Sequence, residues 1–158
     1  MLTLQFSTTN GAGSRLIRFF TWSDFSHVDL VLANQDLLGA RMSGGVRIRK
    51  GTERTFSKVA QFGVHVPATI EEQVIAFLFG QIGKPYDWGA IFGLVFRRNW
   101  QKTDSWFCSE LIAAAFQQAG FPLLRETLNR ITPRDLVMSP LLLPLDVTAE
   151  LMKDQARA

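Results

Sequence analysis

The period of the hydrophobic pattern changes along this chain, and that change constrains the fold more than any other feature. Leu2–Ser7, Ser26–Leu32 and Val59–Val66 alternate apolar and polar residues, which is typical of strands with one buried face. Beyond Thr69 the apolar residues instead recur at helical spacing. Because strands come first and most helices later, we expect an α+β fold in which helices pack on an antiparallel sheet.

The same patterns predict the individual elements. The expected strands are Leu2–Ser7, Ser26–Leu32, Leu37–Met42, Val46–Arg49 and Val59–Val66. The expected helices are Ser14–Trp22, a helix from Thr69 that Gly83-Lys84-Pro85 stops, Cys108–Ala119, and a short helix with Pro133 at its first position. Thr69 with Glu72 predicts a capping box. We expect a single domain over 1–145. The polar tail over 146–158 is interpreted as a frayed helix.

Composition excludes several classes of protein. Of the 158 residues 47% are hydrophobic and 20% charged, enough apolar surface for one folded core and too much for a disordered chain. The net charge of +3 is mildly basic. Two basic groups, Arg47/Arg49/Lys50 and Arg97/Arg98/Lys102, are interpreted as solvated faces, with contact to an anionic polymer or surface as the alternative. No nucleic-acid-binding motif is present, so we expect no nucleic-acid partner.

The N-terminal residues and the hydropathy indicate where the chain is made. MLTLQFSTTNGAG lacks both a charged region and a long apolar region, so we expect no signal peptide. No apolar run reaches the roughly 18 residues of a membrane span, and we expect no transmembrane segment. These features predict a soluble chain that is cytoplasmic when synthesised.

Cys108 is the leading candidate for chemistry. It is the one cysteine, which excludes an intrachain disulfide and multi-thiolate zinc sites. Its place in the first turn of a predicted helix favours a thiolate, although a lone cysteine is more often a small buried hydrophobe. His27, at the start of a predicted strand, is the candidate base, and His65 competes from the middle of another strand. No metal or other cofactor is implied, because a thiolate itself supplies the nucleophile.

Four segments carry a resemblance to a known family. They are Phe25-Ser26-His27-Val28-Asp29, Ile82-Gly83-Lys84-Pro85-Tyr86-Asp87, Trp106-Phe107-Cys108-Ser109-Glu110-Leu111-Ile112 and Ile131-Thr132-Pro133-Arg134-Asp135-Leu136. In this order they resemble the permuted papain-like cysteine hydrolases of the YaeF/YiiX type. These are relatives of NlpC-type cell-wall peptidases and of lecithin–retinol acyltransferase-like enzymes. The resemblance spans roughly residues 14 to 140 and implies a permuted papain-like fold, with the His strand before the Cys helix.

The resemblance implies a role for each matched residue. Cys108 would be the nucleophile, His27 the general base, and the Cys108 backbone N–H part of the oxyanion hole, with Tyr86 lining the site. Relatives orient the histidine with a third polar residue, and Gly39 stands here where a Glu is usual. A four-residue turn would set His27 against Met42, with Ala40 as its neighbour across the strand, and a one-residue slip would offer Gly39 or Arg41 instead. None of these side chains accepts a hydrogen bond from the second imidazole N–H.

Three explanations for the missing third residue stay open. Gln61 or His65 could orient His27 from the next strand. A backbone carbonyl or a water could suffice, which would leave a Cys–His dyad. Alternatively, the site could be degenerate.

Three functions follow from this. The first is a thiol hydrolase that cleaves amide bonds, most plausibly in cell-wall (peptidoglycan) peptides. The second is a lipid acyl hydrolase or acyltransferase, for which an apolar stripe would be needed; Trp88, Phe92, Phe96 and Trp100 offer one, although ordinary helix packing explains it as well. The third is a non-enzymatic structural component, such as a phage tail or baseplate protein, that binds other tail proteins in the virion.

Overall fold

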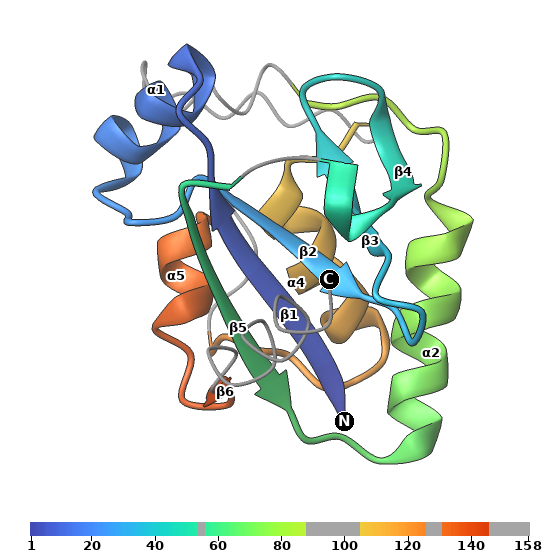
Figure 1. The fold of residues 1–158 in the computed structure, drawn as a ribbon. Coiled ribbons are helices and arrows are strands. Elements are labelled where there is room, and N and C mark those ends of the chain that lie inside the picture. The colour runs from blue at the N-terminus through green and yellow to red at the C-terminus, as the bar shows by residue number, and fades with distance from the viewer. Residues whose placement is uncertain (54–55, 88–104, 126–130, 146–158) are drawn as a thin grey trace, which may run out of the picture.

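The fold is built around one antiparallel sheet (Figure 1). The structure, a computed structural model, describes residues 1–53, 56–87, 105–125 and 131–145. Within these residues the sheet has six strands in the order β4-β3-β2-β1-β5-β6. The strands are β1 (Leu2–Thr8), β2 (His27–Val31), β3 (Leu37–Arg41), β4 (Gly45–Arg49), β5 (Lys58–Val64) and β6 (Leu143–Leu145).

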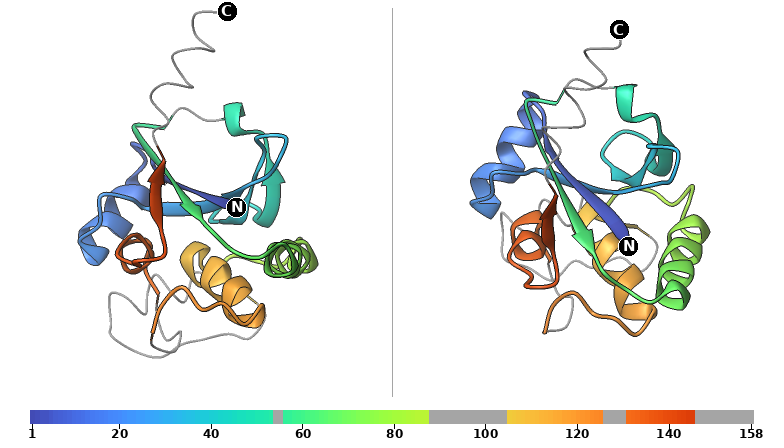
Figure 2. Two further views of the ribbon diagram at one scale, coloured as in Figure 1. Left: turned by 90° about the horizontal axis from the view of Figure 1, so that it is seen from below. Right: turned by 60° about the horizontal axis from the view of Figure 1, so that its bottom comes forward.

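The main helices lie together on one side of this sheet. The described helices are α1 (Ala12–Thr21), α2 (Ala68–Gly80), α4 (Cys108–Gln118) and α5 (Pro133–Val137), with a single 3₁₀ turn η1 (Gly51–Glu53). Figure 2 shows α2, α4 and α5 below the sheet, whereas α1 lies at one end of it. The expected α+β class is therefore confirmed. Among the described helices, none has the length and hydropathy that crossing a bilayer requires.

The two faces of the sheet differ in polarity. On one face Leu4 pairs with Leu30 and Phe6 pairs with Val28, and all four side chains are fully buried in a core that includes residues of α4. Alternate residues project from the other face, where Gln5 pairs with Asp29 and Ser7 pairs with His27. Because side chains alternate along a strand, His27 and Asp29 share this second, polar face.

The predicted elements agree with the structure except at specific points. Each of the five predicted strands and four predicted helices is present within a few residues of its expected bounds. The capping box predicted at Thr69 and Glu72 is wrong, because α2 begins at Ala68 behind Pro67 and has no side-chain cap. η1 and β6 were not predicted, since a three-residue element is too short to show a period. The predicted tail helix and aromatic stripe lie outside the described residues.

The short helix α5 carries the capping box that α2 lacks. The Thr132 side chain accepts a hydrogen bond from the Asp135 backbone, and the Asp135 carboxylate accepts one from the Thr132 backbone. We expect Thr132→Ala to lower the free energy of unfolding by about 1 kcal/mol. The matched change Thr69→Ala should cost less than about 0.5 kcal/mol, because Thr69 makes no such cap. Urea unfolding of both variants measures this difference, and equal losses would contradict it.

Candidate active site

A pocket opens at the end of the sheet where β1 finishes and β2 begins. Its volume is about 240 Å³, and its lining includes His27, Arg41 and Tyr86. Helix α1 closes one wall with Ser14 and Ile17. The pocket therefore lies beside the residue that the sequence proposes as a general base.

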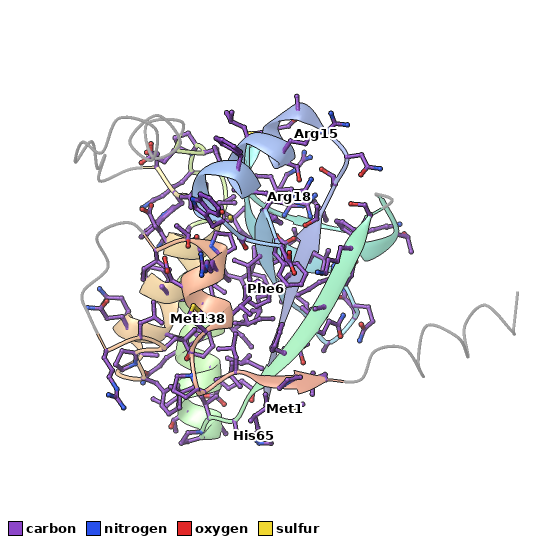
Figure 3. All side chains as sticks on the ribbon, turned by 90° about the vertical axis from the view of Figure 1, so that its left-hand side faces the viewer. Met1, Phe6, Arg15, Arg18, His65 and Met138 are labelled. Carbon is purple, nitrogen blue, oxygen red and sulfur yellow. The ribbon has the colours of Figure 1, made fainter. Side chains whose placement is uncertain are left out.

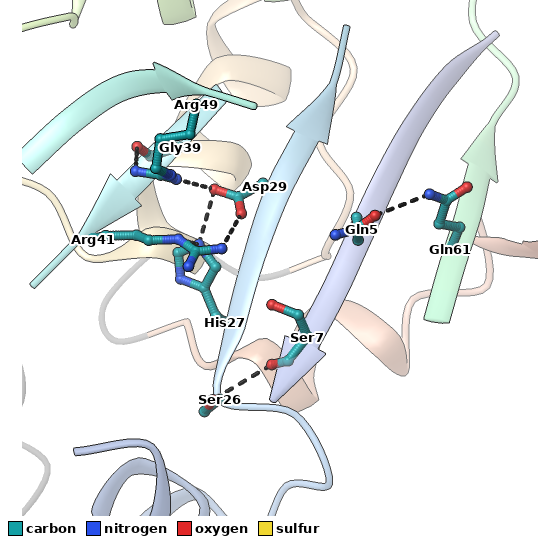
Figure 4. Close-up of polar contacts among 9 residues, drawn as sticks. All are labelled: Gln5, Ser7, Ser26, His27, Asp29, Gly39, Arg41, Arg49 and Gln61. Atoms are coloured by element: carbon teal, nitrogen blue, oxygen red, sulfur yellow. Dashed lines mark hydrogen bonds and ion pairs between the residues drawn. The ribbon is translucent and has the colours of Figure 1, made fainter. Parts of the chain in front are cut away.

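Asp29 holds together the polar cluster beside this pocket (Figure 4). Its side chain is fully buried, and its Oδ1 lies 2.8 Å from His27 Nε2. Arg49 Nη2 donates to Asp29 Oδ1 at 2.7 Å, and Arg41 Nη2 donates to Asp29 Oδ2 at 2.9 Å. One carboxylate on β2 thus binds side chains from β2, β3 and β4.

Gly39 is required by the position of this carboxylate. A Cβ atom added at Gly39 would collide with Asp29 Oδ1. The carboxylate therefore occupies the space of a side chain at residue 39, the position from which a third catalytic residue was expected. Asp29 was not predicted in this role, although its spacing of two from His27 on one strand places both side chains on the same face.

The hairpin register explains why residue 41 faces His27. Leu30 pairs with Leu38 and Val31 with Leu37, and the same register carried back sets His27 against Arg41. The expected pairing of His27 with Met42 is therefore wrong by one residue. Arg41 Nε lies 3.1 Å from His27 Nε2.

Asp29 and His27 take different charge states in this cluster. Burial raises the pKa of Asp29, but His27 and the guanidinium groups of Arg41 and Arg49 more than offset it, so the pKa lies well below its usual value. Burial lowers the pKa of His27 below 6.5, and the nearby Asp29 only partly opposes this. Around neutral pH we therefore infer an ionised Asp29 beside a neutral His27.

The two contacts of His27 Nε2 decide which ring nitrogen carries the proton. A neutral imidazole has one N–H and one lone pair. An ionised oxygen 2.8 Å from Nε2 needs a donor there, so we assign the proton to Nε2 and the hydrogen bond to Asp29. Arg41 Nε, 3.1 Å from Nε2, is placed to donate to the same nitrogen and competes with this bond. Nδ1 is left with the lone pair, which is the atom that a general base needs.

Cys108 is the first residue of α4 and is fully buried. Backbone N–H groups of Val28 and Ser109 contact its sulfur, but burial, with the charges of Asp29 and Glu110, raises the pKa of the thiol to about 12. The thiol therefore lies beside Val28, the residue that follows His27 on β2. In the part of the chain that the structure describes, no hydrogen bond joins this thiol to the His27 imidazole, which contacts Asp29 and Arg41.

Tyr86 connects the neighbourhood of Cys108 to the pocket. It lines the pocket with His27, and its ring packs on Phe107 with the centroids 5.9 Å apart. Burial raises the pKa of its phenol, and the nearby Cys108 adds to the shift. Tyr86 therefore stays protonated, and it neighbours Cys108 while it lines the same pocket as His27.

The two residues proposed to orient His27 from the next strand lie elsewhere. Gln61 Nε2 donates to Gln5 Oε1 at 3.0 Å. His65 is exposed beyond the end of β5, near the pair of Leu2 with Val64, whereas His27 pairs with Ser7 at the opposite end of β1. Figure 3 shows His65 beside Met1, away from α1. Asp29 therefore takes the position expected of them.

One of the three basic residues around β4 differs from expectation, whereas Arg47 and Lys50 are exposed as expected. Arg49 was expected on a solvated face with Arg47 and Lys50, but it is buried against Asp29. Its guanidinium and that of Arg41 repel cations from the Asp29 carboxylate. Within the described ranges, no group of three or more His, Cys, Asp or Glu side chains is placed to bind a metal.

The fold has a solved counterpart. It matches the crystal structure described as the metalloprotein yiiX from Escherichia coli O157:H7, DUF1105, with a TM-score of 0.66 and 18% sequence identity. The match covers 90% of this chain and 94% of that chain. The chain has a YiiX-like fold. No family model matches the sequence, and no curated protein does.

The ionised Asp29 predicts how stability in this YiiX-like fold depends on pH. Its folded pKa lies below the ordinary value of 3.8, so its contribution is complete well above pH 4 and is lost as the pH falls below it. We expect Asp29→Asn to lower the free energy of unfolding at pH 7 by about 3 kcal/mol, since the buried guanidinium of Arg49 and the partly buried one of Arg41 lose their charged partner. The deficit should shrink in acid.

The control for this experiment is Asp24→Asn, because Asp24 forms an exposed pair with Lys58. It should unfold close to the wild type at every pH. Urea unfolding at several pH values from acid to neutral measures both variants. A deficit in Asp29→Asn that does not vary with pH would refute an ionised Asp29.

Cys108 itself should react slowly in the folded protein. With a pKa of about 12 against an ordinary 9.0, the thiol is protonated at pH 8, and burial also blocks access. We expect iodoacetamide to modify the native chain at least about tenfold more slowly than the urea-unfolded chain. Intact-mass measurement over time gives both rates. A native rate equal to or above the unfolded rate would contradict the buried, protonated thiol.

Proposed function

We propose that this chain is a thiol hydrolase in which Cys108 is the nucleophile, His27 the general base and Asp29 the residue that orients His27. The observation that carries the proposal is the 2.8 Å contact of His27 Nε2 with a buried carboxylate, beside a pocket. Asp29 is the third polar residue in this proposal. The glycine at position 39, where relatives carry such a residue, had favoured an inactive site. The YiiX-like fold and the order of the four motifs support membership of the permuted papain-like family.

The proposed reaction is acyl transfer in two steps. His27 Nδ1 takes the Cys108 proton as the sulfur attacks the scissile carbonyl carbon, and backbone N–H groups at the start of α4 stabilise the oxyanion. The leaving amine departs with the proton from His27, which leaves a thioester on Cys108. Water then attacks this thioester while His27 Nδ1 takes one of its protons. The C–S bond breaks, His27 returns the proton to the Cys108 sulfur, and the acid product is released.

The reaction needs a more open arrangement than the structure has. Cys108 is covered and its thiol is protonated, so substrate must displace the covering side chains before the sulfur reaches it. Tyr86 lies where this opening would take place, because it lines the pocket and also neighbours Cys108. Closing of the site behind the substrate is a common way to exclude water.

A peptide amide of the cell wall is the proposed substrate. The residues that line the pocket include Ser7, Thr9, Ser26 and Ser43, which carry hydroxyl groups, and Arg41, which carries a guanidinium. Such groups suit the hydrogen bonds of a peptide backbone and its carboxylates. The net charge of +3 favours approach to an anionic wall.

Two other functions each have one observation in their favour. A lipid acyl hydrolase or acyltransferase is favoured by exposed apolar side chains on α1, next to the pocket. A non-enzymatic role in assembly, as in a phage tail, is favoured by the complete burial of Cys108. A structural protein tolerates a blocked site, whereas an enzyme must open it.

An acyl ester probe tests the proposed function. We expect the wild type to release nitrophenolate slowly from p-nitrophenyl acetate and to carry the acetyl group on Cys108. Cys108→Ala and His27→Ala should abolish this release, and Asp29→Asn should lower it about 10–100-fold. Asp24→Asn should match the wild type. If Cys108→Ala releases nitrophenolate as fast as the wild type, the hydrolase proposal fails and the assembly role stands.

Moving the carboxylate from residue 29 on β2 to residue 39 on β3 tests whether it orients His27 or only stabilises the fold. Gly39→Glu alone should lower the release rate, because its side chain meets Asp29. The double variant Asp29→Gly with Gly39→Glu returns a carboxylate to the same space from β3. We expect it to release nitrophenolate at least about tenfold faster than Asp29→Gly alone. Equal rates in these two variants, with both folded by circular dichroism, would assign Asp29 a structural role only.

A further inference from the structure

Helix α1 has apolar side chains on two sides. Ser14 and Ile17 are buried and line the pocket. On the outer side, Leu16 is 47% exposed, Phe19 73% and Trp22, at the helix end, 82%. Spacings of three place these side chains along one stripe. Large aromatic residues this exposed are unusual for a helix whose only role is to cover a core.

Trp22 also has an unfavourable backbone conformation. It is left-handed, with φ 50° and ψ 38°, and its N–H donates to the Arg18 carbonyl to end the helix. Glycine takes this conformation without cost, whereas a residue with a side chain is strained in it. Burial does not offset that cost, since most of the indole is exposed. Such strain often marks a position with a functional role.

The charges around the stripe are positive. Arg15 is exposed on α1 beside Leu16, and Arg18 lies one turn further along. Asp24, the nearest acid along the chain, pairs with Lys58 at 2.7 Å, and the charge of Arg18 also helps to lower its pKa. A helix with Trp and Phe on its apolar side and arginines beside them matches the composition of helices that lie in an anionic lipid interface.

We propose that α1 and Trp22 dock the protein onto an anionic phospholipid surface. Phe19 and Trp22 enter the acyl–headgroup boundary, and Arg15 and Arg18 contact lipid phosphates. Figure 3 shows Arg15 and Arg18 on the same side of the molecule as Met138, which is 70% exposed. Because α1 is also a wall of the pocket, docking brings the pocket to the lipid surface. The proposal does not depend on the chemistry of Cys108.

Cosedimentation of the full chain with vesicles tests this docking. We expect binding to vesicles of phosphatidylglycerol with phosphatidylcholine, and weak binding to phosphatidylcholine alone. The double variant Phe19→Ser/Trp22→Ser should bind the anionic vesicles at least about tenfold more weakly. Arg15→Gln should bind them about fivefold more weakly and lose part of the salt dependence. The matched control is Phe79→Ser on α2, since Phe79 is 45% exposed, and it should bind within about twofold of the wild type.

Three results would overturn the proposal. One is the absence of binding to anionic vesicles at low salt. Another is equal weakening by Phe79→Ser and by the double variant, which would show that no particular face binds. The third is a wild type that self-associates through α1 in light scattering and does not bind vesicles, which would assign the stripe to a second copy. Ester release plays no part in these readouts, so failure of docking and failure of hydrolysis are distinguishable.

Discussion

The pairing of a buried negative charge with two guanidinium groups is the interaction on which this end of the fold depends. An ionised carboxylate without partners costs several kcal/mol in a protein interior. Asp29 avoids that cost because Arg41 and Arg49 reach it from β3 and β4. Both strands must therefore keep their spacing and register opposite β2. The orientation of the His27 imidazole, and with it one wall of the pocket, follows from the same contacts.

The division of the sheet into two faces decides where chemistry can take place. The apolar face packs on α4 and so buries Cys108, while the polar face carries His27 and Asp29. At the end of the sheet Tyr86 lines the pocket with His27 and also neighbours Cys108, so groups from both sides come close to one another there. The arrangement differs from that of an open cleft, and it combines a His27 imidazole held by Asp29 with a fully buried Cys108 thiol. A YiiX-like fold at 18% identity fixes the chain path without fixing these side chains.

Sequence periodicity predicted the strands and helices because long alternating and helical patterns survive tertiary packing. It did not predict the register of β2 with β3. There Leu32 pairs back to Asp36, and Gln35 turns left-handed with φ 65°, a conformation that glycine or asparagine would have indicated. The thiolate expected of Cys108 at a helix start was also wrong, because burial raises the pKa of the thiol. The burial depends on side chains that are distant in sequence, so the sequence pattern did not predict it. Asp29 was not predicted either, but its spacing of two residues from His27 was a signal in the sequence that could have identified it.

The contact between Asp29 and Gly39 has a consequence for how such a chain can diverge. A side chain at residue 39 and a carboxylate at residue 29 compete for the same volume, so neither position can change freely while the other stays. A lineage that moves the carboxylate from residue 29 to residue 39 must change one position before the other. Its intermediate ancestor then has either no carboxylate at these two positions or two side chains that collide. Such crossings are rare, and we expect residues 29 and 39 to covary as a unit among descendants. Searches that require an acidic residue at a fixed strand position will then overlook chains of this kind.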